Sequence, residues 1–191
     1  MATKANSPCV IVLASGRGER FIAAGGTGPK LQAPLAGKPL LERTLDAVRG
    51  SGLPWRVEDA GHPGMGDSIA AAVRATPDAA GWLILPGDLP LVRPETLRAV
   101  ADALAGRVRA VQPQYKGERG HPVGFSAGCG AQLAALRGTL GASSILKAMR
   151  AIDAVADLVV DDVGIVTDID TPEALAAAEA LWLERSAGRP G

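Results

Sequence analysis

The residues that could do chemistry begin directly after a short apolar run at residues 10–13, which predicts a buried parallel strand. The loop that follows is rich in small and basic residues, namely Ser15, Gly16, Arg17, Gly18 and Arg20, with Lys30 further along. Backbone N–H groups in such a loop, together with arginine and lysine side chains, can bind one polyanion. Open α/β sheets bind ligands outside the carboxyl ends of their strands, so the loop predicts a phosphate site.

The spacing of this loop differs from two common phosphate-binding motifs. A P-loop needs Gly-Lys-Ser or Gly-Lys-Thr after a four-residue gap, which this stretch does not contain. The Gly-x-Gly-x-x-Gly fingerprint fails because Phe21 stands where the third glycine would follow Gly16 and Gly18. An alternative interpretation is a surface loop with solvated charges, and the motifs further along the chain argue against it.

Asp88 follows a second apolar run at residues 82–85, in the stretch Pro-Gly-Asp-Leu-Pro. A carboxylate at the end of a buried strand can hold Mg²⁺, a hard cation that prefers oxygen ligands and keeps several waters. The alternative is an aspartate that stabilises a turn. Because a phosphate loop precedes it in the chain, we expect Asp88 to be a metal ligand.

Two further aspartates, Asp168 and Asp170, precede a helix that begins near Pro172. In an extended segment, residues two apart point to the same side. We expect Asp168 to share the metal with Asp88, and Asp170 to cap the helix, support the site or contact substrate. The alternative is that both carboxylates only cap the helix.

Ser68 and His121 are the remaining polar candidates. Gly64 and Gly66 precede a predicted helix and would let a ligand approach closely, and Ser68 could hydrogen-bond a base or ribose. Alternatively, Ser68 is only a helix cap. His121 lies in a loop that leads into a strand and could contact a substrate phosphate or a pterin, although a single histidine in a turn is often structural.

Apolar runs alternate with amphipathic segments along the chain. Strands are predicted at residues 10–13, 82–85, 109–112, 156–160 and 164–167, and helices at 39–49, 67–75, 94–105, 131–136, 143–149 and 172–184. This order predicts an α/β three-layer sandwich with a mainly parallel sheet. Between the first of these helices and Gly66 there is room for one short strand at most, around residues 55–57.

Composition limits the class of protein. The 191 residues suit a single domain over residues 1–191, with residues 186–191 as a frayed tail. Lys plus Arg equals Asp plus Glu at 20 each, so neither a nucleic-acid nor a membrane surface is expected. Cys9 and Cys129 lack CxxC spacing, which argues against zinc. With no signal-peptide pattern, we expect a cytoplasmic protein.

Five stretches occur together in one order: LASGRGERF followed by Lys30, then GMGDSIAAAV, GDLPLV, RGHPVGF and DIDTPEAL. With them the chain resembles the molybdenum cofactor cytidylyltransferase group of nucleotidyltransferases, which is related to the guanylyltransferases of the same pathway. The resemblance implies a single Rossmann-like nucleotidyltransferase domain. It also implies Mg²⁺-dependent transfer of CMP from CTP to the phosphate of molybdopterin, with release of pyrophosphate.

The resemblance also assigns roles by position. It implies that the NTP is bound by Leu13, Ala14, Ser15, Gly16, Arg17, Gly18, Arg20, Lys30 and Ser68. Arg20 and Lys30 would bind the triphosphate, and Asp88 with Asp168 would hold Mg²⁺. An acceptor phosphate is already an anion, so catalysis would need positioning and charge neutralisation rather than a general base. The molybdenum cofactor partners implied are a molybdoenzyme or its chaperone, with the chain a monomer or weak dimer.

The chain departs from this family pattern on the acceptor side. The family usually has Gly-Asp-x-Gly-Ala-Arg before its penultimate helix, whereas Thr139 and Ser143 stand here in place of the Asp and the Arg. This leaves two alternatives open: nucleotidyl transfer to a different phosphorylated acceptor, or a non-catalytic accessory protein that binds nucleotide or cofactor. The side chain of Ser15 would limit the approach of a bulky purine, so we expect CTP in preference to GTP.

Overall fold

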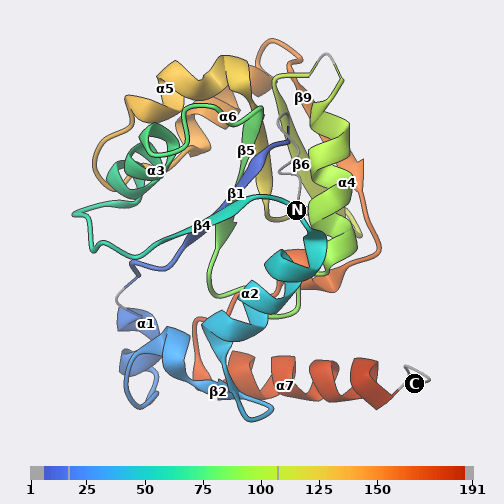
Figure 1. Ribbon diagram of the computed structural model, residues 1–191. Coiled ribbons are helices and arrows are strands. Elements are labelled where there is room, and N and C mark those ends of the chain that lie inside the picture. Colours follow the sequence, from blue (N-terminus) through green and yellow to red (C-terminus); the bar gives the residue numbers. More distant parts are fainter. Residues whose placement is uncertain (1–6, 17, 107, 188–191) are drawn as a thin grey trace.

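A central β-sheet organises the chain (Figure 1). The computed structural model describes residues 7–16, 18–106 and 108–187. Within these residues seven strands form the main sheet: β1 (Cys9–Leu13), β4 (Trp55–Glu58), β5 (Gly81–Pro86), β6 (Ala110–Tyr115), β7 (Glu118–Arg119), β8 (Val123–Ser126) and β9 (Val155–Val159). A separate hairpin consists of β2 (Pro34–Leu35) and β3 (Lys38–Pro39).

The described residues form seven helices, most of which cover the two faces of this sheet, while the first and the last lie beyond one end of it (Figure 1). The seven helices are α1 (Glu19–Ala23), α2 (Leu40–Ser51), α3 (Met65–Arg74), α4 (Pro94–Leu104), α5 (Gly130–Ala134), α6 (Ser143–Arg150) and α7 (Pro172–Ala187). Short 3-10 helices are η1 (Lys30–Gln32), η2 (Ala127–Cys129) and η3 (Val163–Val166). No helix of the described residues is both long and apolar enough to cross a membrane.

The sheet is mixed but mostly parallel, as the sequence predicts. Its order is β4-β1-β5-β8-β6-β7, with β9 also pairing with β6. Strand β1 runs parallel to β4 and β5, and β9 runs parallel to β6, whereas β8 is antiparallel to both of its neighbours. The parallel centre brings the carboxyl ends of β1, β4 and β5 to one edge, which is where the predicted phosphate loop begins.

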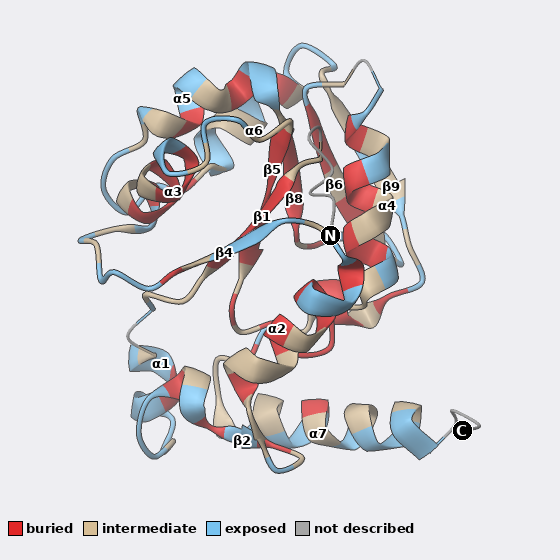
Figure 2. Cartoon of the chain, in the orientation of Figure 1, coloured by how far each residue is buried: buried red, intermediate tan, exposed pale blue. Residues whose placement is uncertain are grey.

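The three-layer arrangement follows from the alternation of side chains along the strands. In β1, Val10 and Val12 pack into a cluster with Leu45 of α2 and Leu97 of α4. Ile11 points to the opposite face, into a cluster with residues of α3, α5 and α6. Figure 2 shows the buried residues concentrated on the sheet and on the inner sides of these helices.

A third apolar cluster lies apart from the sheet and supports the segment that carries Lys30. Phe21 of α1 and Leu40 of α2 pack there with Ile169 and with Ala178 of α7. The β2–β3 hairpin joins this group, because the N–H of Ala36 donates to Oε1 of Glu179 on α7 at 2.6 Å. This cluster joins residues 21–40 to α7 beside the cleft described below.

One predicted strand is wrong: residues 164–167 do not pair with the sheet, and Val163–Val166 form the 3-10 helix η3. The cause is buried Asp162, whose Oδ1 accepts from the Gly164 N–H at 3.0 Å and whose Oδ2 accepts from the Thr96 hydroxyl at 2.7 Å. These bonds turn the chain back toward α4. The single short strand expected around residues 55–57 is present as β4.

The last helix is longer than the sequence predicts. Helix α7 continues to Ala187, so Ser186 and Ala187 are helical rather than part of a tail. The hydroxyl of Ser186 donates to the carbonyl of Trp182 at 2.8 Å within this last turn. The rest of the predicted tail, residues 188–191, lies outside the described residues.

Candidate functional site

An open cleft of about 1120 Å³ lies where β1 and β5 end. Most of the residues predicted from sequence line it: Leu13, Ser15, Gly16, Gly18, Arg20, Lys30, Ser68, Asp88, His121, Asp168 and Asp170. Ala14 is not among the lining residues, and its N–H donates to the carbonyl of Glu58 at 2.9 Å. Arg17 lies outside the described residues. The topology therefore collects motifs from the whole length of the chain around one cleft.

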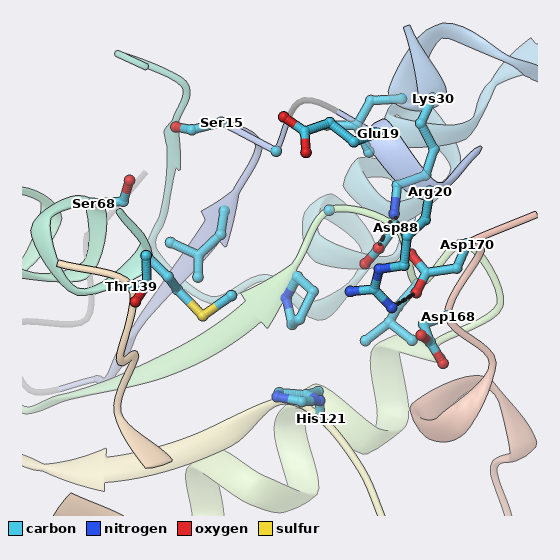
Figure 3. Close-up of a pocket in the computed structure, with 18 of the residues that line it drawn as sticks. Ser15, Glu19, Arg20, Lys30, Ser68, Asp88, His121, Thr139, Asp168 and Asp170 are labelled. Atoms are coloured by element: carbon cyan, nitrogen blue, oxygen red, sulfur yellow. Dashed lines mark hydrogen bonds and ion pairs between the residues drawn. The ribbon is translucent and has the colours of Figure 1, made fainter. Parts of the chain in front are cut away.

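Lys30 is at the centre of the charged end of the cleft (Figure 3). Its side chain is only 10% exposed, and its Nζ donates to Asp88 Oδ2 at 2.7 Å and to Asp170 Oδ1 at 2.9 Å. Arg20, whose side chain is 83% exposed, donates to the other oxygen of Asp170. Two cations and two carboxylates from distant parts of the sequence thus form one network.

The pKa values in this network follow from its contacts. Burial lowers the pKa of Lys30, but its hydrogen bonds and charge interactions with Asp88 and Asp170 outweigh burial and raise it above the usual value. Burial raises the pKa of Asp170, but Lys30 and Arg20 outweigh this effect and lower it. Lys30 and Asp170 are therefore both charged at neutral pH.

Asp88 is placed by the ends of the two central strands. The N–H of Gly87 donates to the carbonyl of Leu13 at 2.9 Å, and a Cβ at Gly87 would lie 3.0 Å from that oxygen. The carbonyl of Asp88 accepts from the N–H of Ile169 at 3.2 Å. This last bond brings the segment after η3 beside Asp88, which local sequence does not reveal.

The carboxylates at this end suit a hard divalent cation. Oδ1 of Asp88 is buried and has no hydrogen-bond partner among the described residues, which is the state of an oxygen available to a cation. The described residues contain no group of three or more His, Cys, Asp or Glu that could hold a metal ion. A cation held by one or two carboxylates would take its other ligands from water and substrate phosphates, as Mg²⁺ commonly does.

The two aspartates before α7 occupy different environments. Both line the cleft, as their spacing predicts, but Asp168 is exposed whereas Asp170 shares Lys30 with Asp88. Asp170 does not cap α7, because that position belongs to Thr171, whose hydroxyl accepts from the Ala174 N–H at 3.2 Å. The pairing of Asp88 with Asp168 around a metal stays a prediction.

The opposite end of the cleft is less charged and contains Ser15, Ser68 and Thr139 (Figure 3). The hydroxyl of Ser15 donates to the carbonyl of Glu58 at 3.1 Å. Ser68 lies buried on the first turn of α3 and is one of the lining residues of the cleft. These hydroxyl groups could contact a base or a ribose.

The glycines before Ser68 have a different role from the one expected. A Cβ at Gly64 would lie 2.2 Å from the backbone of Gly138, and the N–H of Gly66 donates to the Gly138 carbonyl at 2.8 Å. Asp67 accepts from the Gly138 N–H at 2.9 Å. The space that these glycines leave is therefore filled by the backbone at Gly138 rather than by a ligand. This contact places the next residue, Thr139, at the cleft.

His121 forms part of the cleft floor. Its N–H donates to the carbonyl of Ile165 at 2.9 Å, and a Cβ at neighbouring Gly120 would lie 2.2 Å from the same oxygen. Burial lowers the pKa of His121, although the charges of Asp88 and Asp168 act in the opposite direction. The imidazole is therefore neutral at pH 7 and able to accept a hydrogen bond.

Several lining residues were not predicted from the sequence, among them Glu19, His62, Glu118, Arg119 and Thr139. His62 follows β4, and its Nε2 lies 3.4 Å from Oε1 of buried Glu58. A usable signal was available for this pair, since Glu58 and His62 come directly after the one strand expected in that region. Arg119 lies on a two-residue strand, which is too short to give a period-2 pattern.

The mostly parallel sheet and the cleft at its carboxyl edge define an α/β domain of the nucleotidyltransferase fold. Residues 10–155 match the family model for MobA-like NTP transferase domains, and the chain belongs to that family. It is 34% identical over 122 residues to the bifunctional protein GlmU of Xanthomonas campestris pv. campestris (strain 8004). That alignment covers 52% of this chain and 26% of GlmU, so the chain spans about a quarter of the length of this relative.

Solved structures share the fold over nearly the whole chain. Rv0371c of Mycobacterium tuberculosis H37Rv superposes with a TM-score of 0.74 at 25% identity, covering 93% of this chain and 99% of Rv0371c. A structure of Rv0371c in complex with manganese gives 0.70 at 24% identity, covering 93% and 100%. Molybdopterin-guanine dinucleotide biosynthesis protein A of Archaeoglobus fulgidus gives 0.57 at 21% identity, covering 92% and 99%.

Proposed function

We propose that this chain transfers a nucleotidyl group from a nucleoside triphosphate to a phosphorylated acceptor and releases pyrophosphate. The observation that carries the proposal is the network of Arg20, Lys30, Asp88 and Asp170 at the end of the cleft. It combines two cations suited to a triphosphate with carboxylates suited to a divalent cation. Membership of the MobA-like NTP transferase family supports the same chemistry.

Each group has a role that its position allows. The amides of the loop at Ser15, Gly16 and Gly18 would bind phosphate oxygens, while Arg20 and Lys30 would neutralise charge on the triphosphate. Asp88 would hold Mg²⁺, with Asp170 or Asp168 beside it, and the cation would act as a Lewis acid at the phosphates. An acceptor phosphate needs no deprotonation, which agrees with the neutral His121 being a contact rather than a required base.

For the donor we propose CTP in preference to GTP, and for the acceptor a molybdopterin-type phosphate. Ser15 adds a side chain at the end of the cleft where the base would bind, which favours the smaller pyrimidine. The acceptor class rests on the resemblance of RGHPVGF and DIDTPEAL to molybdenum cofactor enzymes. Thr139 lines the cleft where the family usually has an aspartate, and this favours a different phosphorylated acceptor as the second candidate.

Pyrophosphate release tests the proposal directly. The four NTPs would be assayed with Mg²⁺ and either molybdopterin or other phosphorylated acceptors, and CTP with molybdopterin should be the most active pair. Asp88→Asn should lower turnover by at least ~10²-fold, the scale for loss of one key electrostatic group. Asp102→Asn is the matched control, because Asp102 is exposed on α4 away from the cleft. Nucleotide binding without pyrophosphate release from any acceptor would favour a non-catalytic accessory protein.

A further inference from the structure

Lys30 contacts both Asp88 and Asp170, two carboxylates that the proposed function assigns to a divalent cation. Its Nζ bonds one oxygen of Asp88 and one of Asp170, so the ammonium lies between the two carboxylates. Arg20 holds the second oxygen of Asp170. Of the four carboxylate oxygens, Oδ1 of Asp88 alone lacks a partner among the described residues. The chain therefore supplies its own counter-ions to these carboxylates.

Lys30 is also built into the phosphate loop. A Cβ at Gly18 would lie 2.8 Å from the Cβ of Lys30, so the loop packs directly on the stem of this side chain. Gly18 has a φ of +64°, the left-handed region that favours glycine. The loop and Lys30 line the same cleft, so a phosphate bound by the loop amides would enter the space that Lys30 borders. The same ammonium can pair with the carboxylates or with a phosphate, but it has only three N–H donors to share.

We propose that Lys30 is a resident counter-ion that keeps a free divalent cation off Asp88 and Asp170 until the nucleotide's phosphates draw its ammonium away. The inference rests on the proposed function for its nucleotide and metal. A divalent cation placed on these carboxylates meets the Lys30 charge a few ångströms away, in a partly buried site where screening is weak. A triphosphate removes this repulsion because it brings negative charge and a new partner for the lysine. Metal and nucleotide then bind with positive coupling.

The test measures Mn²⁺ binding without nucleotide, by electron paramagnetic resonance of the free ion at neutral pH. The wild-type chain should bind Mn²⁺ weakly, and Lys30→Met should bind it at least about tenfold more tightly, because one repulsive charge is gone. Lys38→Met is the matched control. Lys38 pairs with Asp46 at 2.5 Å outside the cleft, and its removal should change Mn²⁺ affinity by less than about twofold.

Two further variants locate the effect. Adding Asp88→Asn to Lys30→Met should abolish the gained affinity, which shows that the ion binds at this carboxylate. Arg20→Gln should tighten Mn²⁺ binding by a smaller factor of about two to five, because Arg20 is exposed and its charge is better screened. Circular dichroism reports whether Lys30→Met folds, and if it does not, the exposed Arg20→Gln variant decides the question.

The proposal is overturned if a folded Lys30→Met variant binds Mn²⁺ no more tightly than the wild type, or if Arg20→Gln shows no gain when Lys30→Met does not fold. In that event pyrophosphate release that depends on Asp88 would still support nucleotidyl transfer. Conversely, a gain in Mn²⁺ affinity without any pyrophosphate release would preserve the counter-ion role and reject the transferase activity. The two failures are therefore distinguishable.

Discussion

At the residue scale, the carboxylates of Asp168 and Asp170 differ in their contacts. Asp170 shares Lys30 with Asp88 and binds Arg20, whereas Asp168 is exposed on the same cleft wall. The contact that aligns them is the bond from the Ile169 N–H to the Asp88 carbonyl. Asp170 and Asp88 both contact the Lys30 ammonium, so their carboxylates lie near each other. Asp170 is therefore better placed than Asp168 to share a metal ion with Asp88.

We therefore expect Asp170→Asn to cost more activity than Asp168→Asn. The first should lower pyrophosphate release by about 10²-fold, because it removes charge next to Lys30 and Asp88. The second should lower it by less than about tenfold, since an exposed carboxylate is well solvated. Steady-state assays of both variants decide between them. A larger loss in Asp168→Asn would establish the pairing of Asp88 with Asp168 that the sequence predicts.

Ser15 is the residue on which donor choice depends in this proposal. Its hydroxyl donates to the Glu58 carbonyl at 3.1 Å, which fixes the rotamer of a side chain that lines the cleft. A pocket that discriminates only by space is worth ~1–3 kcal/mol, which predicts a preference for CTP of tens-fold. Ser15→Gly should narrow this gap by improving GTP use. Competition binding of CTP against GTP measures it, and equal affinities in the wild-type chain would contradict the assignment.

At the scale of elements, the site depends on how closely η3 packs against the turn between β7 and β8. A Cβ at Gly120 would lie 2.2 Å from the Ile165 carbonyl oxygen, so the two segments can approach only with glycine there. The same contact holds His121 and positions the segment that leads to Asp168. The two nearest atoms belong to the backbone of Ile165, which cannot move aside as the end of a flexible side chain could.

Gly120→Ala should accordingly destabilise the fold by about 1–3 kcal/mol, the usual cost of overpacking. It should also lower activity, because His121 and the segment after η3 would shift together. Urea denaturation gives the change in stability. Gly128→Ala serves as the control and should be nearly neutral, since a Cβ there meets only the Ser126 hydroxyl at 3.9 Å. An unchanged stability in Gly120→Ala would show that the turn has room to relax.

At the scale of the whole molecule, opposite charges are equal in number, and stability should depend on pH through a few perturbed groups. The raised pKa of Lys30 contributes stability that is lost only as the pH rises above 10.5. The lowered pKa of Asp170 contributes stability that is lost only as the pH falls below 3.8. Neither group alters stability between mildly acidic and neutral pH.

Of Lys30, Asp170 and His121, only His121 should change the stability between mildly acidic and neutral pH. Its pKa in the folded chain lies below 6.5, so the unfolded chain binds a proton first, and stability falls as the pH drops through that value. The unfolding free energy of His121→Gln relative to the wild type should therefore improve as the pH falls from about 7.5 to about 5. Urea denaturation at both pH values measures the difference. A difference that does not change with pH would mean that His121 is protonated equally in both states.

Much of this molecule was determined by local sequence. The alternation of apolar runs with amphipathic segments predicted the mostly parallel α/β fold, because periodicity depends on neighbours along the chain. The loop from Ser15 to Arg20 and the carboxylate of Asp88 could be predicted as site residues because each follows a predicted strand. Their convergence then follows from parallel topology, which brings the carboxyl ends of strands to one edge.

Only the tertiary structure decided which groups meet inside the cleft. Lys30 contacts Asp170, which lies 140 residues away, and the backbone bond from Ile169 to Asp88 brings that segment to the cleft. The 3-10 turn at residues 163–166 likewise depends on buried Asp162, whose partners include Thr96 on another element. Local periodicity carries no information about such contacts, because they exist only once distant segments have packed.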